Sequence, residues 1–237
     1  MMSTASSRAE PVPVDGTALQ PVKQQGTHDF SQMRAHMVDS QLRPNSVTSD
    51  DIVAAFREVP REAFVPKDML AFAYLDEDIE VAPGRFMMEP LTLGRLIEFA
   101  EPRNGEKALV IGGTTGYSAA VLAMLALDVV LLEDGIEPAV AISRVPNLKP
   151  VSGPLNEGYG ENGPYDLILI EGRIDYLPDT ILSQVKEGGR VAAVIMDEGT
   201  ARAGIGRVFG GHIGWTFVSD AGVAPLPGFA KEKGFAF

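Results

Sequence analysis

Residues 107–117 read Lys-Ala-Leu-Val-Ile-Gly-Gly-Thr-Thr-Gly-Tyr, and this stretch decides the fold. The apolar run 107–111 predicts a buried strand, and the glycines after it predict a tight turn into a helix that begins at Tyr117. Glycines let a ligand approach the backbone closely, and the N-terminus of a helix offers unpaired amides. The stretch therefore predicts a ligand-binding turn between a strand and a helix.

An acidic residue follows the next apolar run. The run 129–132 predicts a second strand, and Glu133 comes directly after it, about 20 residues beyond Gly113. At this separation a carboxylate can accept hydrogen bonds from the hydroxyls of a ribose, so the pattern indicates a nucleoside-containing cofactor. The candidate cofactor-binding residues are Gly112, Gly113, Thr114, Gly116, Tyr117 and Glu133.

Two alternatives stay open for this pattern. The turn can be a simple tight connection, with Glu133 a solvated acid at the end of a strand. A dinucleotide site would need a second glycine where this chain has Thr114, which disfavours NAD more than a smaller nucleoside cofactor.

Strand and helix patterns alternate along the rest of the chain. Further strands are predicted at 148–151, 166–170 and 190–195, and helices at 117–127, 136–144 and 177–185, with Gly188-Gly189 just beyond the end of the last helix. The runs 213–219 and 222–225 predict an antiparallel hairpin. Five strand–helix units predict an α/β fold, a parallel, doubly wound sheet covered by helices on both faces.

The part before this core is helical. Residues 1–28 are rich in Pro, Ser, Thr and Gln and predict a flexible tail. Helices are predicted from Phe30 to before Pro44, from Thr48 to before Pro60, in a short piece through Ala73-Tyr74, and over 90–100. For the second helix we expect a hydroxyl cap at its N-terminus, with an acid three positions on. The expected division is 1–28, then a lead-in at 29–100 that forms one domain with a Rossmann-like core at 101–237.

Composition excludes several kinds of site. The chain has no cysteine, which excludes disulfides, zinc–thiolate sites, iron–sulfur clusters and a thiol nucleophile, and its three histidines are too few for a histidine-rich metal site. The net charge of −12 argues against duplex DNA or an anionic membrane as the main partner. No run is long enough to predict a membrane helix, so a cytoplasmic location is expected.

Several segments in order resemble the protein-L-isoaspartate O-methyltransferase family. The resemblance covers about residues 33–237, and its segments are Met37-Val-Asp-Ser-Gln41-Leu42, Val59-Pro-Arg61-Glu62-Ala-Phe64-Val65-Pro66, Ala73-Tyr74-Leu-Asp76, Gly116-Tyr117-Ser-Ala-Ala-Val-Leu-Ala123, Pro164-Tyr165-Asp166, Leu182-Ser-Gln184-Val-Lys-Glu-Gly188-Gly189-Arg190 and Ala224-Pro225-Leu226. It implies a class I methyltransferase fold with an antiparallel C-terminal strand, S-adenosylmethionine as cofactor, and methylation of an isoaspartyl carboxylate in a protein or peptide for repair. An ionised carboxylate needs no general base, so such catalysis is chiefly alignment and desolvation.

The chain departs from the family pattern at functional positions. The substrate loop reads Gly84-Arg-Phe-Met-Met-Glu-Pro90, so Met88 stands where the family has a serine. Val110, Thr114 and Pro154 replace an acid, a glycine and a second acid of the cofactor motifs, whereas Glu133 remains. Three lost hydrogen bonds would weaken cofactor binding by roughly two to three powers of ten.

These departures leave the roles of the loop residues open. Arg85 and Arg61 can meet a substrate carboxylate or brace a loop, and Met88 can line an apolar pocket or fill the core. The alternatives to an isoaspartyl methyltransferase are a non-catalytic module with a methyltransferase fold, a methyltransferase with another acceptor and, more distantly, an NAD-dependent oxidoreductase.

Overall fold

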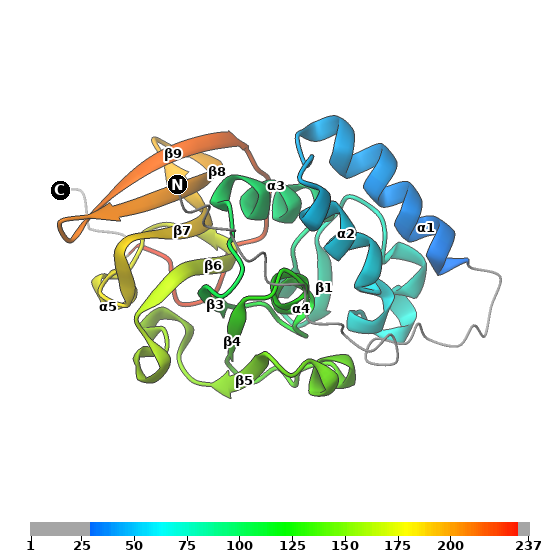
Figure 1. Cartoon of the computed structure of the whole chain (residues 1–237), viewed down its shortest axis with the longest axis horizontal. Coiled ribbons are helices and arrows are strands. Elements are labelled where there is room, and N and C mark those ends of the chain that lie inside the picture. Colours follow the sequence, from blue (N-terminus) through cyan, green and yellow to red (C-terminus); the bar gives the residue numbers. More distant parts are fainter. Residues whose placement is uncertain (1–28, 232–237) are drawn as a thin grey trace, which may run out of the picture.

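The structure, a computed structural model, describes residues 29–231 (Figure 1). Its α-helices are α1 (Phe30–His36), α2 (Asp50–Glu58), α3 (Pro90–Ala100), α4 (Tyr117–Met124) and α5 (Asp179–Leu182). Its strands are β1 (Ile79–Ala82), β2 (Arg85–Met87), β3 (Lys107–Ile111), β4 (Asp128–Glu133), β5 (Leu148–Ser152), β6 (Tyr165–Ile174), β7 (Val185–Asp197), β8 (Thr200–Phe209) and β9 (His212–Asp220). The predicted flexible tail at 1–28 lies outside the described residues.

Seven strands form one mixed sheet. Their order is β5-β4-β3-β6-β7-β8-β9; the first five are parallel, and β8 and β9 are antiparallel to their neighbours. The direction of winding reverses between β3 and β6, because β4 and β5 lie on one side of β3 and β6 and β7 on the other. In open α/β sheets, ligands bind at such a switch point, outside the carboxyl ends of the strands.

The register of the central strands aligns the residues that follow them. Ile111 of β3 pairs with Leu132 of β4 and with Ile170 of β6. One position further along, Gly112, Glu133 and Glu171 therefore stand side by side at the switch point. Parallel pairing of three buried strands is what brings these distant positions to one edge.

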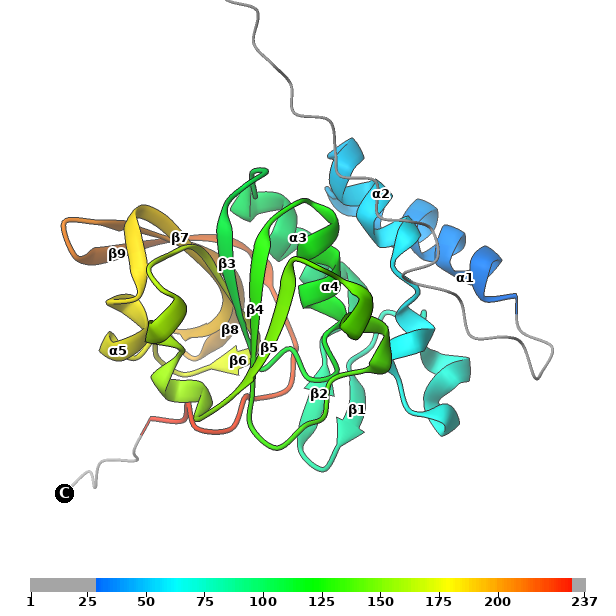
Figure 2. The ribbon, with the colours of Figure 1, turned by 60° about the horizontal axis from the view of Figure 1, so that its bottom comes forward.

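The helical lead-in packs on one face of the sheet (Figure 2). Phe30 of α1, Phe56 of α2 and Phe64 share one buried cluster with Ala108 and Val110 of β3. The lead-in and the sheet thus share one buried core, while the expected division at 29–100 and 101–237 stays a prediction.

The other face is covered more thinly than the sequence predicts. There Ile111 and Ile168 pack in a second cluster with Ile181 of α5 and with Phe229 near the C-terminus. Because α5 is a single turn, irregular segments supply most of this layer. The sequence predicts helices on both faces of the sheet, whereas a full helical layer covers the face on which the lead-in packs.

Several element boundaries differ from the sequence prediction. The hairpin at the C-terminus joins β8 to β9, and residues 222–225 form no strand; Pro225 makes one isolated bridge to Arg173. Gly188-Gly189 lie inside β7 and not at the end of a helix, and the predicted helix 136–144 is reduced to a 3-10 turn over Val140–Arg144.

The expected cap of α2 is also wrong, although the helix itself is confirmed. The Ser49 side chain makes no capping hydrogen bond. The Ser49 amide instead donates to both carboxylate oxygens of Glu98 on α3, at 3.1 and 3.2 Å, and the Thr48 hydroxyl donates to the same group. A neighbouring helix thus supplies the acceptor that the sequence assigns to a local side chain.

Within residues 29–231, no helix has the length and apolarity that crossing a membrane requires. The same residues hold no cluster of three or more His, Asp or Glu side chains arranged as metal ligands.

Candidate active site at the switch point

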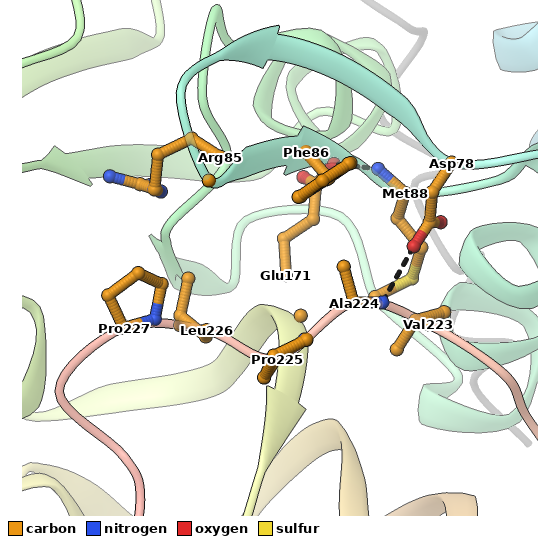
Figure 3. Close-up of a pocket in the computed structure, with 12 residues that line it drawn as sticks. Asp78, Arg85, Phe86, Met88, Glu171, Val223, Ala224, Pro225, Leu226 and Pro227 are labelled. Carbon is orange, nitrogen blue, oxygen red and sulfur yellow. Dashed lines mark hydrogen bonds between the residues drawn. The ribbon is translucent and has the colours of Figure 1, made fainter.

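Three segments that are distant in sequence meet at the carboxyl ends of β3 and β6 (Figure 3). The β1–β2 hairpin brings Arg85 and, just after β2, Met88, and the end of β6 brings Glu171. The third segment is residues 221–231, here called the C-terminal strap, whose Leu226 faces the other two.

The glycine turn has the backbone geometry that its sequence predicts. Gly112 and Gly116 have φ of +72° and +101°, which favours glycine, and Gly116 is the N-cap residue of α4. Thr114, with φ +52°, is buried, and its hydroxyl has no hydrogen-bond partner within the described residues.

The space in front of this turn is filled by the strap. A Cβ built on Gly112 would lie 2.7 Å from Cδ1 of Leu226, and one on Gly172 would lie 2.9 Å from Cβ of Leu226. The two glycines therefore accommodate the leucine side chain where the motif predicts room for a ligand.

Glu133 is already engaged by the chain itself. Arg85 Nη2 donates to both of its carboxylate oxygens, at 2.7 and 3.0 Å. The amides of Thr114 and Asp134 donate to the same carboxylate. Burial raises the pKa of Glu133, against the opposing effect of the Arg85 charge and these hydrogen bonds. The acid expected to bind a ribose is thus saturated by protein donors.

Backbone hydrogen bonds hold the strap over the end of β6. Leu226 N donates to the carbonyl of Arg173, Arg173 N to that of Ala224, and Ala224 N to Oδ2 of Asp78, each at 2.8 Å (Figure 3 draws the last). Phe229, further along the strap, is buried in the second core cluster.

The cavity that remains is about 10 Å³ in volume. That is enough for about one water molecule, whereas pockets for small-molecule ligands measure roughly 300–1,000 Å³. The residues present therefore do not fit a nucleoside cofactor in this arrangement, although the glycine turn and Glu133 stand in the predicted places.

Glu171 is a site residue that the sequence reasoning missed. Its side chain is buried, it accepts hydrogen bonds from the Met88 amide at 2.9 Å and from the Ser118 hydroxyl, and burial raises its pKa to about 7. The available signal was an acid directly after 166–170, the clearest buried strand of the sequence.

Other predicted residues lie in the core behind the cleft. Arg61 is buried; it donates to the carbonyls of Ala73 at 2.8 Å and Met88 at 2.7 Å, and its guanidinium lies 4.8 Å from the centre of the Tyr117 ring. Burial raises the pKa of Tyr117 to about 12. Met88 is buried in the main core cluster and also lines the small cavity. Arg61 braces the loop, and the proposed site roles of Met88 and Tyr117 stay predictions.

A larger hollow lies elsewhere and does not match the expected site. It measures about 980 Å³ and is lined by α2 and by the segments that precede β3 and β4, which are at the amino ends of those strands. Ligands of this fold class bind at the carboxyl ends, so the switch point is the better candidate despite its smaller volume.

Comparison with known sequences gives one consistent family. The family model for protein-L-isoaspartate(D-aspartate) O-methyltransferase matches residues 32–203. A Rhodopseudomonas palustris protein-L-isoaspartate O-methyltransferase 1 is 31% identical over 196 residues, 80% of this chain and 76% of the relative. The enzyme of that name from Koribacter versatilis is 29% identical over 206 residues, 84% of this chain and 92% of the relative.

Solved structures agree with the sequence comparisons. One protein-L-isoaspartate O-methyltransferase has a TM-score of 0.67 and 25% identity, with 84% of this chain and 65% of that chain covered. A proposed protein-L-isoaspartate O-methyltransferase from Plasmodium falciparum, solved with S-adenosyl-L-homocysteine, has a TM-score of 0.67 and 18% identity, with 84% and 99% covered. The class I methyltransferase fold predicted from the sequence is thereby confirmed, and the chain belongs to the protein-L-isoaspartate(D-aspartate) O-methyltransferase family.

Proposed function

We propose that the chain is an S-adenosylmethionine-dependent methyltransferase that acts on isoaspartyl carboxylates of proteins or peptides, and so serves protein repair. The family match over residues 32–203 carries this proposal. The glycine turn at β3 and Glu133 at the end of β4 support it, because both occupy the positions at the switch point that a nucleoside cofactor requires.

The proposed activity requires a more open arrangement of the cleft. Leu226 and Arg85 take up the space and the carboxylate that the cofactor would use. Access therefore needs the strap and the β1–β2 hairpin to separate. Arg85 is a candidate for contact with a substrate carboxylate once it has left Glu133.

The direct test is methyl transfer to a matched pair of peptides that differ only in carrying isoaspartate or aspartate. We expect S-adenosylhomocysteine to form, and the methyl group to be found on the isoaspartyl peptide alone. Formation of S-adenosylhomocysteine without methylation of the isoaspartyl peptide would instead indicate that the chain methylates another acceptor.

Glu133 supplies a variant for the same assay. Glu133→Ala is expected to weaken cofactor binding about ten- to hundredfold, because a carboxylate that accepts hydrogen bonds from a ribose is worth about 1.5–3 kcal/mol. Asp134→Ala is the control, because Asp134 is adjacent and exposed. Equal cofactor affinity in the two variants would show that the cofactor does not reach Glu133.

The closed cleft favours a second candidate function, a methyltransferase-fold binding module without catalysis. The cavity of about 10 Å³ is the observation that supports it. Absence of both cofactor binding and methyl transfer, in the native protein and in variants that open the cleft, would favour this module over the enzyme. The cytoplasmic location and the absence of nucleic-acid and membrane partners stay predictions.

A further inference from the structure

We propose that Arg85 and Leu226 act as internal occupants of the cofactor cleft, so that the cofactor must displace both before it binds. This inference rests on the proposed function, because it takes the cleft to be a cofactor site. Two side chains of the native protein thus compete with the cofactor for the same cleft.

Arg85 occupies the polar half of the cleft. It comes from β2, is buried, and places one guanidinium nitrogen within hydrogen-bond distance of both oxygens of Glu133. Thr114 and Asp134 donate to the same two oxygens, so the carboxylate has little remaining capacity for ribose hydroxyls. Arg85 and a ribose are therefore alternatives at Glu133.

Leu226 occupies the apolar half of the cleft. Its side chain lies against Gly112 and Gly172. Because these glycines have no Cβ atom, they leave space in front of the turn. A ligand that approaches the Gly112 backbone would overlap with the leucine. The two residues, Arg85 and Leu226, come from segments about 140 residues apart in the sequence, so the whole fold is needed to bring both side chains into one cleft.

The closed arrangement also has features that permit opening. Arg85 Nε is buried and has no hydrogen-bond partner among the protein groups of residues 29–231, so the closed arrangement leaves one of its donors unused by the protein. The strap crosses the end of β6 as an irregular segment with a single bridge, from Pro225 to Arg173, and is not a strand of the sheet. Such a segment can separate from the site without breaking the sheet.

If the closed state competes with the ligand, the apparent dissociation constant is the intrinsic constant divided by the fraction of open molecules. A substitution that removes an internal occupant should then tighten binding. We choose Leu226→Ala, which frees the space at Gly112, and Arg85→Gln, which frees Glu133. The probe is S-adenosylhomocysteine, titrated by calorimetry into the full chain.

Matched controls separate this effect from general loosening. Leu182→Ala removes a leucine that packs on the same core cluster from α5. Arg207→Gln breaks an arginine–carboxylate pair with Glu101 on the surface. We expect Leu226→Ala and Arg85→Gln to bind S-adenosylhomocysteine at least about tenfold more tightly than the native chain and both controls do.

Hydrogen exchange gives a second readout that does not depend on activity. The amides of Arg173, Ala224 and Leu226 hold the strap in place. Ligand binding that displaces the strap should speed exchange at these three amides in the native chain. A ligand that binds beside an undisturbed strap would leave them unchanged or slow them.

The outcomes decide between the inference and the proposed function. Tighter binding with faster strap exchange supports the inference, and tighter binding without methyl transfer to an isoaspartyl peptide supports it while overturning the proposed function. Equal affinity in the native chain and both variants overturns the inference and leaves the function standing. Absence of binding in all of them overturns the inference and removes the cofactor on which the function depends.

Discussion

At the scale of single residues, Glu171 shows the clearest physical consequence of its position. The residue is 1% exposed, and burial raises the pKa of its carboxyl group from 4.5 to about 7 despite hydrogen bonds from Ser118 and Met88. The folded protein therefore holds a proton on Glu171 at a pH where the unfolded chain has released it. Stability is lost as pH rises through this range, because the folded state then binds more protons than the unfolded state.

This shift predicts the pH dependence of a Glu171→Gln variant. The native chain should lose about 3 kcal/mol of unfolding free energy from this group between pH 4 and pH 8, since each pKa unit corresponds to about 1.36 kcal/mol. The variant lacks the titrating group, so its stability should fall less steeply and exceed that of the native chain at pH 8. Urea unfolding at both pH values measures the difference, with exposed Glu77→Gln as control. Parallel pH profiles of Glu171→Gln and the native chain would contradict this assignment.

At the scale of elements, α2 depends on a contact that its own sequence does not contain. Glu98 of α3 accepts the Ser49 amide and the Thr48 hydroxyl at the start of α2. A carboxylate at this end also interacts favourably with the helix dipole. The contact joins two helices of the layer that covers the sheet.

We therefore predict that Glu98→Ala destabilises the protein by about 1 kcal/mol, the usual cost of losing an N-terminal cap. Ser49→Ala should change the unfolding free energy by a few tenths of a kcal/mol at most, because the Ser49 side chain makes no capping hydrogen bond. Chemical denaturation of the two variants distinguishes the cases. A larger loss of unfolding free energy for Ser49→Ala than for Glu98→Ala would show instead that the Ser49 side chain caps the helix, as the sequence alone suggests.

Some strands of the sheet could be predicted from the sequence and others could not. The buried strands β3, β4 and β5 follow from short apolar runs, and the structure places them within one or two residues of the prediction. Strand β8 was missed because Gly204 and Gly206 interrupt its pattern. A Cβ at Gly206 would lie 2.3 Å from Cδ1 of Ile213 on β9, so this glycine makes room for a side chain of the neighbouring strand, which a local pattern does not reveal.

At the scale of the whole molecule, the cleft is assembled from segments that no local motif connects. The turn at Gly112 and Glu133 could be predicted, since their spacing reflects one strand–helix–strand unit. The pairing of Glu133 with Arg85 and the seating of Leu226 on Gly112 depend on how the hairpin and the strap fold back over the sheet. The ordered sequence segments therefore indicated the right family, whereas the closed state of the site follows only from the three-dimensional arrangement.

We propose, for the molecule as a whole, that it methylates isoaspartyl carboxylates through a cleft that Arg85 and Leu226 hold closed. The most direct measurement is transfer of a labelled methyl group from S-adenosylmethionine, at low concentration, to an isoaspartyl peptide and to its aspartyl twin. We expect label on the isoaspartyl peptide alone, with faster transfer by Leu226→Ala than by the native chain. Label on the isoaspartyl peptide no higher than on its twin, in both proteins, would contradict it.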